Sequence, residues 1–124
     1  MAKVKFYRCE HCKNITALIN DEGGTLSCCG HNMTELVANT SDGAKEKHVP
    51  DIKKENGKLK VTIGSVLHPS LPEHYIQWIA LATDDKLQFA YLKPGQDPKA
   101  EFEEVKSGTV YEYCNIHGLW KAEI

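Results

Sequence analysis

The chain lacks several features that would place it in a common functional class. Among its 124 residues, no apolar run approaches the roughly 20 residues of a membrane span, and residues 1–20 hold no apolar stretch of signal-peptide length. It has no glycine-rich nucleotide-binding loop, internal repeat or low-complexity tract. With a formal net charge of −2, it carries no overall basic field for nucleic acid. The sequence therefore predicts a cytoplasmic protein that binds neither nucleic acid nor a membrane.

Sustained helical periodicity is absent as well, and apolar residues instead alternate with polar ones in the second half of the chain. The alternating segments cover residues 59–63, 76–80, 87–91, 110–114 and 120–124. A period of two is typical of strands with one buried face, and turn-forming residues at 93–95 and 106–108 separate such segments. The sequence therefore predicts an all-β fold with a β-sandwich as its larger unit.

The first 37 residues are too few to bury a core of their own. Two short strands are expected at residues 3–7 and 16–19, on either side of a Cys-x-x-Cys sequence. Units below roughly 40 residues usually need a metal ion or disulfides to fold. We therefore predict a metal-stapled domain over residues 1–37 and a second domain over 38–124. Within the second domain, the polar residues 38–57 are expected to be a linker and loop.

The five cysteines are distributed unevenly, and four of them lie in the first quarter: Cys9, Cys12, Cys28 and Cys29. In a reducing cytosol such clusters are more often metal ligands than disulfides, and an odd count fits a closed disulfide framework poorly. Cys28 and Cys29 are adjacent, so both can bind one ion only if the backbone bends sharply, which Gly24 and Gly30 make easier. Four thiolates hold zinc or iron, and the spacing does not decide between them.

The fifth cysteine, Cys114, stands apart, three residues before His117. A single thiolate needs nitrogen ligands to complete a metal site, and three further histidines lie upstream: His48, His68 and His74. Prolines next to or near two of these histidines suit a loop that must hold ligands rigidly. The uneven division of the cysteines therefore predicts two separate metal sites.

Three kinds of site could use the second set of residues. A cupredoxin-like copper site usually takes an axial methionine, but the only methionines are Met1 and Met33. A cysteine–histidine hydrolase would leave three histidines unexplained. An iron site with several imidazoles and one thiolate uses all five residues, and the thiolate pushes electron density onto the metal.

Several motifs in the second domain occur together in the order found in one known family. They are Glu46-Lys47-His48-Val49-Pro50, His68-Pro69, His74-Tyr75-Ile76, Leu92-Lys93-Pro94-Gly95 and Glu112-Tyr113-Cys114-Asn115-Ile116-His117-Gly118. In this combination the chain resembles superoxide reductase. Its N-terminal cysteines resemble those of the two-iron form, desulfoferrodoxin, so the resemblance covers nearly the whole chain.

The resemblance implies a desulforedoxin-like, rubredoxin-like domain with a ferric iron, followed by an immunoglobulin-like β-sandwich with a second iron that cycles between Fe2+ and Fe3+. The first iron falls on the four N-terminal cysteines. The second falls on the remaining cysteine and four histidines, with the sixth coordination position open: His48, His68, His74, His117 and Cys114. The resemblance also implies that Glu46 binds the oxidised iron and that Lys47 lies beside the open position. Without the resemblance, the sequence would place Glu46 and Lys47 in an ordinary run of solvated charged residues.

The activity implied is the one-electron reduction of superoxide to hydrogen peroxide, with electrons from rubredoxin or a similar donor, in a homodimer. Three positions depart from the family pattern and bear on substrate access: Ser70, Tyr111 and Leu119. Trp78 and Trp120 are expected in the sandwich core rather than as electron conduits. The rival functions are a dismutase and a non-enzymatic electron carrier or zinc-binding interaction module.

Overall fold

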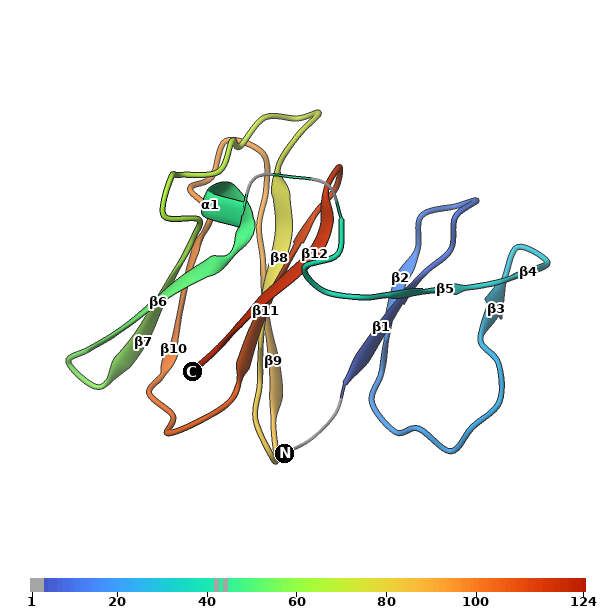
Figure 1. The fold of residues 1–124 in the computed structure, drawn as a ribbon, viewed down its shortest axis with the longest axis horizontal. Coiled ribbons are helices and arrows are strands. Elements are labelled where there is room, and N and C mark those ends of the chain that lie inside the picture. Colours follow the sequence, from blue (N-terminus) through green and yellow to red (C-terminus); the bar gives the residue numbers. More distant parts are fainter. Residues whose placement is uncertain (1–3, 42, 44) are drawn as a thin grey trace. The chain divides into compact units, whose positions relative to one another are not determined.

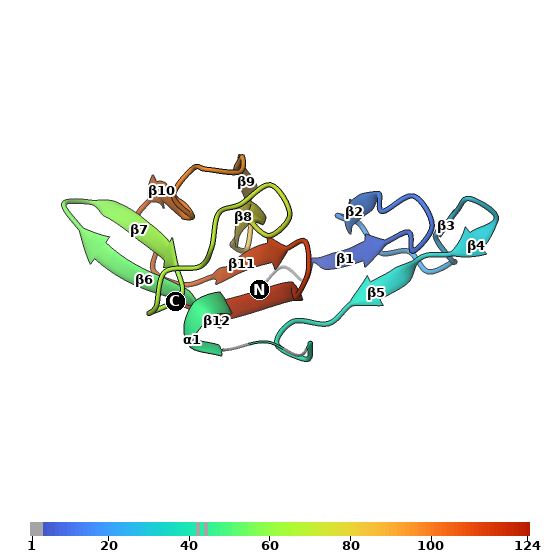
Figure 2. The same ribbon diagram turned by 90° about the horizontal axis from the view of Figure 1, so that it is seen from above.

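The computed structural model describes residues 4–41, 43 and 45–124, and almost every element in it is a β-strand (Figures 1 and 2). The chain divides into two compact units, one ending at Val37 and one running from Ala38 to Ile124. The one helix in the described part of the chain, α1 (Lys45–His48), makes a single turn. No helix among these residues is long and apolar enough to cross a membrane. The predicted all-β fold is confirmed.

The small unit consists of a three-stranded antiparallel sheet and a short hairpin. The sheet has the order β2-β1-β5 and the hairpin pairs β3 with β4. The strands are β1 (Lys5–Arg8), β2 (Ile15–Leu18), β3 (Ser27–Cys28), β4 (His31–Asn32) and β5 (Thr34–Leu36). The expected strand at residues 3–7 begins outside the described residues. Only Phe6 and Cys9 are buried among the described residues of this unit. So little apolar burial agrees with the expectation that a metal holds the unit together.

The larger unit is a sandwich of two antiparallel sheets, with orders β10-β7-β6 and β12-β11-β8-β9 (Figure 1). Its strands are β6 (Pro50–Glu55), β7 (Lys58–Ile63), β8 (Ile76–Ala82), β9 (Leu87–Tyr91), β10 (Lys99–Glu103), β11 (Thr109–Cys114) and β12 (Gly118–Glu123). Alternate residues of β7 and β8 fill the core: Leu59, Val61, Ile63, Ile79 and Leu81. The predicted sandwich is therefore confirmed.

The prediction that residues 38–57 form only linker and loop is wrong. This segment contains α1 and the whole of β6, which pairs with β7 from Pro50↔Ile63 to Glu55↔Lys58. β6 lies at the edge of its sheet, and of its residues only Pro50 is fully buried. Because burial does not select apolar residues along such a strand, its sequence lacks the alternation that predicts strands. The other edge strand of the sheet, β10, was also missed, although Ala100 and Phe102 alternate with charged residues along its five positions.

One glycine lets the turn after β7 pass close to α1. Gly64 has a φ of +86°, and its N–H donates to the Val49 carbonyl at 3.1 Å. A Cβ atom on Gly64 would lie 2.7 Å from the Lys47 carbonyl oxygen and 2.8 Å from that of Glu46. Only glycine fits so close a crossing in this backbone conformation. The crossing brings α1 beside the turn at the same end of the sandwich (Figure 1).

We expect Gly64→Ala to lower the free energy of unfolding by about 3 kcal/mol, because the new Cβ adds a backbone clash to the strain of a positive φ. Gly57→Ala is the matched control: Gly57 has a φ of +76° in the β6–β7 turn, but no atom lies within 4 Å of its added Cβ. This control should cost about 1 kcal/mol, for strain alone. If chemical denaturation shows the same loss of unfolding free energy in both variants, the crowding at Gly64 is contradicted.

Candidate metal centres

The four N-terminal cysteines of the small unit come together as one donor set. Their sulfur atoms all lie within 4.8 Å of one another, and Cys12 Sγ is 3.7 Å from Cys28 Sγ. The Cys12 N–H donates to Cys9 Sγ at 3.4 Å. This backbone hydrogen bond is the main reason that the pKa of Cys9 falls to about 6. The turn therefore favours a thiolate before any metal binds.

The adjacent cysteines face the same point because the backbone reverses between them. Cys29 has a φ of +54° and Gly30 a φ of +77°, so two successive residues adopt the left-handed conformation that follows β3. The sulfur atoms of Cys28 and Cys29 are consequently 3.9 Å apart, although neighbouring side chains normally diverge. This is the sharp bend that two adjacent ligands require.

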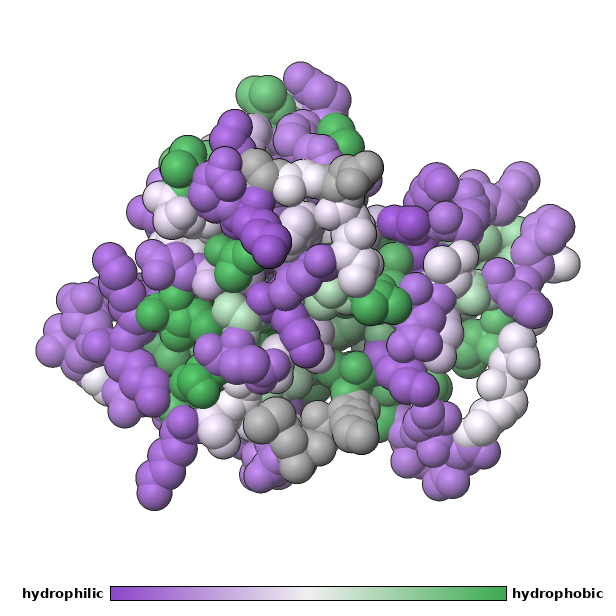
Figure 3. Space-filling model, in the orientation of Figure 1, coloured by the Kyte–Doolittle hydropathy of each residue, from purple (hydrophilic) through white to green (hydrophobic). Residues whose placement is uncertain are grey.

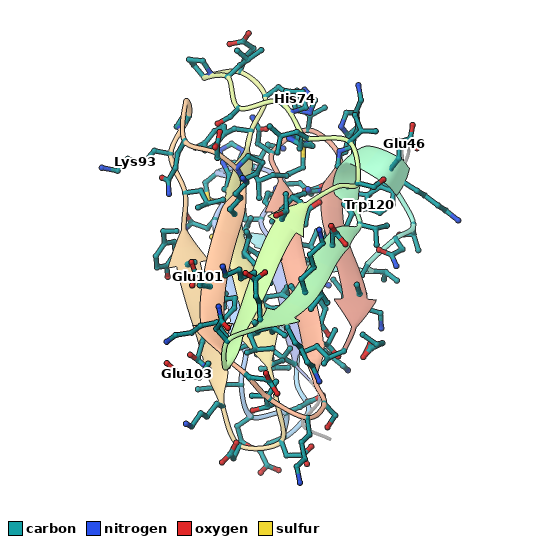
Figure 4. All side chains as sticks on the ribbon, turned by 90° about the vertical axis from the view of Figure 1, so that its left-hand side faces the viewer. Glu46, His74, Lys93, Glu101, Glu103 and Trp120 are labelled. Carbon is teal, nitrogen blue, oxygen red and sulfur yellow. The ribbon has the colours of Figure 1, made fainter. Side chains whose placement is uncertain are left out.

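A second donor set lies at one end of the sandwich, on three separate segments of the chain. It consists of His48 from the end of α1, His68 and His74 from the loop before β8, Cys114 from the end of β11 and His117 from the turn before β12. One donor atom from each residue lies within 4.8 Å of the other four. Figure 4 shows His74 in the loops beyond the strand ends, with Glu46 on α1 at the same end. We call this set the histidine–cysteine site.

The four imidazole rings of the histidine–cysteine site follow one another in a closed circle. Each ring meets the next edge to face: the centroid distances are 4.8 Å for His48–His68, 4.7 Å for His68–His74, 5.0 Å for His74–His117 and 4.8 Å for His117–His48. Four nitrogens can therefore surround a single point. Cys114, buried at the end of β11, adds a sulfur donor 3.9 Å from His117 Nδ1.

Two nitrogen atoms of this site lack hydrogen-bond partners among the described residues, whereas His48 Nε2 and His117 Nδ1 lie 3.1 Å apart. The Nε2 atoms of His68 and His74 are buried without a hydrogen-bond partner in the described part of the chain. His68 Nδ1 lies 2.7 Å from the Pro69 carbonyl oxygen, so Nδ1 carries the proton and Nε2 keeps its lone pair. Buried lone pairs that point at one another are costly unless a cation lies between them. The donor set therefore fits a metal ion.

Burial favours the neutral form of three donors of this site, His68, His74 and Cys114. Desolvation lowers the pKa of His68 to about 4. Desolvation also lowers the pKa of His74, and the charges of His117 and Lys47 lower it further. Burial raises the pKa of the Cys114 thiol, against the opposing effect of the N–H groups of His117 and Ile116. Neutral imidazoles are ready to bind a metal, whereas the thiol must lose its proton to the incoming charge.

Trp120 supports two of the histidines, a role that the sequence did not predict. Its indole Nε1–H donates to the His117 carbonyl oxygen at 3.0 Å, and its ring stacks on His48 with centroids 4.9 Å apart. Trp120 and Trp78 are both buried, as expected for the sandwich. The three-residue spacing between His117 and Trp120 was visible in the sequence, but the stacking on a residue of another segment was not.

Glu46 and Lys47 are exposed on α1, and no Glu46 oxygen belongs to the five-donor group. The backbone of Glu46 ties α1 to the loop before His68, because its carbonyl accepts the Val66 N–H at 2.8 Å and the Ser65 hydroxyl at 3.3 Å. The roles expected for the side chains of Glu46 and Lys47 stay predictions.

A buried carboxyl group, Glu112, was missed at the sequence level. It is fully buried, and neither carboxylate oxygen has a hydrogen-bond partner among the described residues. Desolvation raises its pKa well above the usual value. Glu112 lies on β11 opposite Trp120 of β12 and Ile79 of β8. The alternation of Val110, Glu112 and Cys114 in the sequence could have revealed that it points inward.

We expect Glu112→Met to raise the free energy of unfolding by about 1–2 kcal/mol at neutral pH, since a similarly sized apolar side chain removes an unpaired polar group. Because the folded-state pKa is raised, the folded protein retains a proton that the unfolded chain releases above its ordinary pKa of about 4.5. Stability is therefore lost as the pH rises, and the gain from methionine should grow between pH 5 and pH 8.

Chemical denaturation of both proteins across this pH range measures the gain. Glu112→Gln is the control, because it removes the titration but still buries a polar group, so its gain should be smaller. A methionine gain that is the same at pH 5 and pH 8 would contradict a raised pKa.

Comparison with known proteins accounts for both donor sets. The family model described as desulfoferrodoxin matches residues 40–123, and that of the desulfoferrodoxin N-terminal domain matches residues 2–36. The chain belongs to the desulfoferrodoxin family. It is 50% identical over 122 residues to a desulfoferrodoxin of Desulfarculus baarsii, covering 98% of this chain and 97% of the relative. It is 36% identical to a superoxide reductase of Thermococcus kodakarensis, covering 74% of this chain and 97% of the relative.

A solved structure supports the same assignment over both units. The superoxide reductase from Treponema pallidum matches with a TM-score of 0.77 and 30% identity, covering 97% of this chain and 98% of that one. The resemblance seen in the sequence is thereby confirmed. Family membership together with the two donor sets identifies iron as the metal of both sites, a choice that the cysteine spacing had left open.

The three departures from the family pattern lie outside both donor sets. Ser70 has a structural role, since its hydroxyl donates to the Gln96 carbonyl at 2.7 Å and accepts the Gly95 N–H at 2.9 Å. It thereby fastens the histidine-bearing loop to the turn after β9. Leu119 is buried, and Tyr111 is half-buried with a pKa raised by desolvation.

Proposed function

We propose that this protein is a superoxide reductase. It would reduce superoxide by one electron to hydrogen peroxide at the histidine–cysteine site, using electrons from an external donor such as rubredoxin. The observation that carries this proposal is the closed circle of four imidazoles with a single buried thiolate, Cys114. No sixth donor joins this group among the described residues, so a metal held there would keep one coordination position for a small substrate. The relatives named superoxide reductase support the same reaction.

The overall reaction combines one superoxide, one electron and two protons to give one hydrogen peroxide. Iron bound at this site would supply the electron, and a thiolate ligand makes iron a better donor. Cys114 is the residue that would push electron density toward the open position. The N–H of His117 donates to Cys114 Sγ at 3.4 Å, which tempers that effect. The two protons would come from solvent.

Lys47 would draw the substrate to the site. Superoxide is an anion, whereas the protein as a whole carries a slight negative charge, so any attraction must be local. The charge of Lys47 lowers the pKa of His74, against the opposing charge of Glu73, which supports a local positive field beside the site. Glu46, next to it, would close the site after oxidation. The carboxylate lies outside the donor group, so closure would require α1 or its flanking loop to move.

Exposed apolar side chains beside the ligands support an external electron donor. Val66, Leu67, Leu71 and Ile116 are each about half exposed, and all lie within three residues of a ligand. Apolar residues lie on the surface at this end of the larger unit (Figure 3). Weak electron-transfer complexes use small contact areas of this kind. The identity of the donor, a homodimer and a cytoplasmic location stay predictions, as does any relay through the four-cysteine iron.

Lys47→Ala should slow the second-order reaction with superoxide about tenfold at low salt and flatten its dependence on ionic strength, because a local attractive charge is lost. Pulse radiolysis measures the rate. Lys45→Ala is the matched control, since Lys45 lies two positions away on the same helical turn and so faces another direction. If the two variants respond to salt alike, Lys47 has no special role in attracting the substrate.

Cys114→Ser should abolish the thiolate-to-iron charge-transfer absorption of the histidine–cysteine site, together with reductase activity. The absorption of the four-cysteine centre is the internal control and should persist. Metal analysis of the unmodified protein should give iron at both sites. Zinc alone would favour an interaction module. A Cys114→Ser variant that keeps both the charge-transfer absorption and the activity would show that Cys114 is not a ligand of the active metal.

A further inference from the structure

The side chain of Asn115 spans two of the loops that carry metal ligands. It follows Cys114 directly, two residues before His117, and it reaches across to the residues on either side of His74. Its Oδ1 accepts the Tyr75 N–H at 2.9 Å, and its Nδ2 donates to the Glu73 carbonyl at 3.1 Å. The Asn115 backbone N–H also donates to the Tyr75 carbonyl at 3.3 Å. Three hydrogen bonds thus bracket a single histidine.

The backbone of His74 itself is held by its own loop. Its N–H donates to the Leu71 carbonyl and its carbonyl accepts the Leu71 N–H, both at 3.0 Å. Leu71 belongs to the same loop as His74, so these two bonds shape the loop but do not place it against Cys114 and His117. Among the hydrogen bonds described here, those of Asn115 are the ones that join residues 73–75 to the loop between β11 and β12. The backbone bond continues the β8–β11 pairing by one residue, since Cys114 pairs with Ile76 after the register shift, whereas the two side-chain bonds are additional to that pairing.

We infer that Asn115 is a positioning residue that fixes the His74 imidazole within the circle of ligands. Asparagine suits this task because one planar group presents an acceptor and a donor in a fixed relation. Aspartate has the same shape but no donor, and its charge would face the Glu73 carbonyl oxygen. The inference shares with the proposed function only the metal site, and it does not require the reaction with superoxide. It assigns a role to a residue that itself binds no metal.

The test measures metal affinity, so it does not depend on the reaction with superoxide. The full-length apo protein is titrated with Co2+, whose absorption distinguishes a four-sulfur site from a nitrogen-rich one. Asn115→Asp should weaken binding at the histidine–cysteine site about 10- to 100-fold, as loss of a group that orients a ligand typically does. Binding at the four-cysteine site of the same molecules should be unchanged. Unchanged affinity at the histidine–cysteine site would overturn the inference.

Asn39→Asp is the matched control for a general loss of stability. Asn39 makes a similar pair of bonds to a backbone, since its Oδ1 accepts the Lys121 N–H at 2.9 Å and its Nδ2 donates to the Lys121 carbonyl at 3.4 Å. The control should lower the melting temperature, followed by the fluorescence of the two sandwich tryptophans, but change Co2+ affinity less than about twofold. An equal loss of affinity in both variants would show that Asn115 is merely structural.

A double-mutant cycle with His74→Ala tests whether Asn115 acts through that histidine. In the His74→Ala background, Asn115→Asp should change Co2+ affinity by less than about twofold, because the ligand that it positions is gone. An effect as large as in the unmodified protein would contradict the assignment to His74. The cycle also separates two possible failures: a lost coupling rejects the role of Asn115, whereas absent reductase activity with intact coupling rejects only the proposed function.

Discussion

The larger unit must hold five electron-pair donors close together around one buried point, and this requirement constrains the rest of its structure. The four imidazoles and the Cys114 thiol are buried or half-buried, and desolvation disfavours a charge on His68, His74 and Cys114. Without a cation, burying these unpaired polar atoms costs free energy, which favours their moving apart or admitting water. They stay together because each is attached to an element fixed by the sandwich: the end of β11, the turn into β12, the loop before β8, and α1 beside Gly64.

The two units relate to their metals in opposite ways. The small unit has only Phe6 and Cys9 buried among its described residues, so its four cysteines supply a stability that apolar packing cannot. The larger unit has a core of its own and uses it to hold ligands in place, with Trp120 behind His48 and His117 and Asn115 around His74. Four thiolates make a closed centre, whereas one thiolate opposite an open position makes a place where a substrate can bind.

The interior strands and both donor sets could be predicted from the sequence, and the contacts between distant segments could not. Alternation revealed β7 and β8 because each has a fully buried face, but it failed for β6, which lies at a sheet edge and buries only Pro50. The ligands were found because cysteine and histidine are chemically distinctive and the motifs resemble a known family. Trp120 and Asn115 act through a stacked ring and three hydrogen bonds across the fold, and no local pattern encodes such contacts. Glu112 alternates with Val110 and Cys114, so the same pattern places it on the buried face of β11.

The central claim is that the histidine–cysteine site reduces superoxide with electrons from outside the protein. The most direct measurement is the stoichiometry of the reaction, with superoxide consumed, reductant oxidised, and hydrogen peroxide and oxygen formed all followed together. The account predicts one donor electron and one hydrogen peroxide for each superoxide, with no oxygen evolved. One oxygen for every two superoxide ions, with no reductant consumed, would show a dismutase and contradict the account.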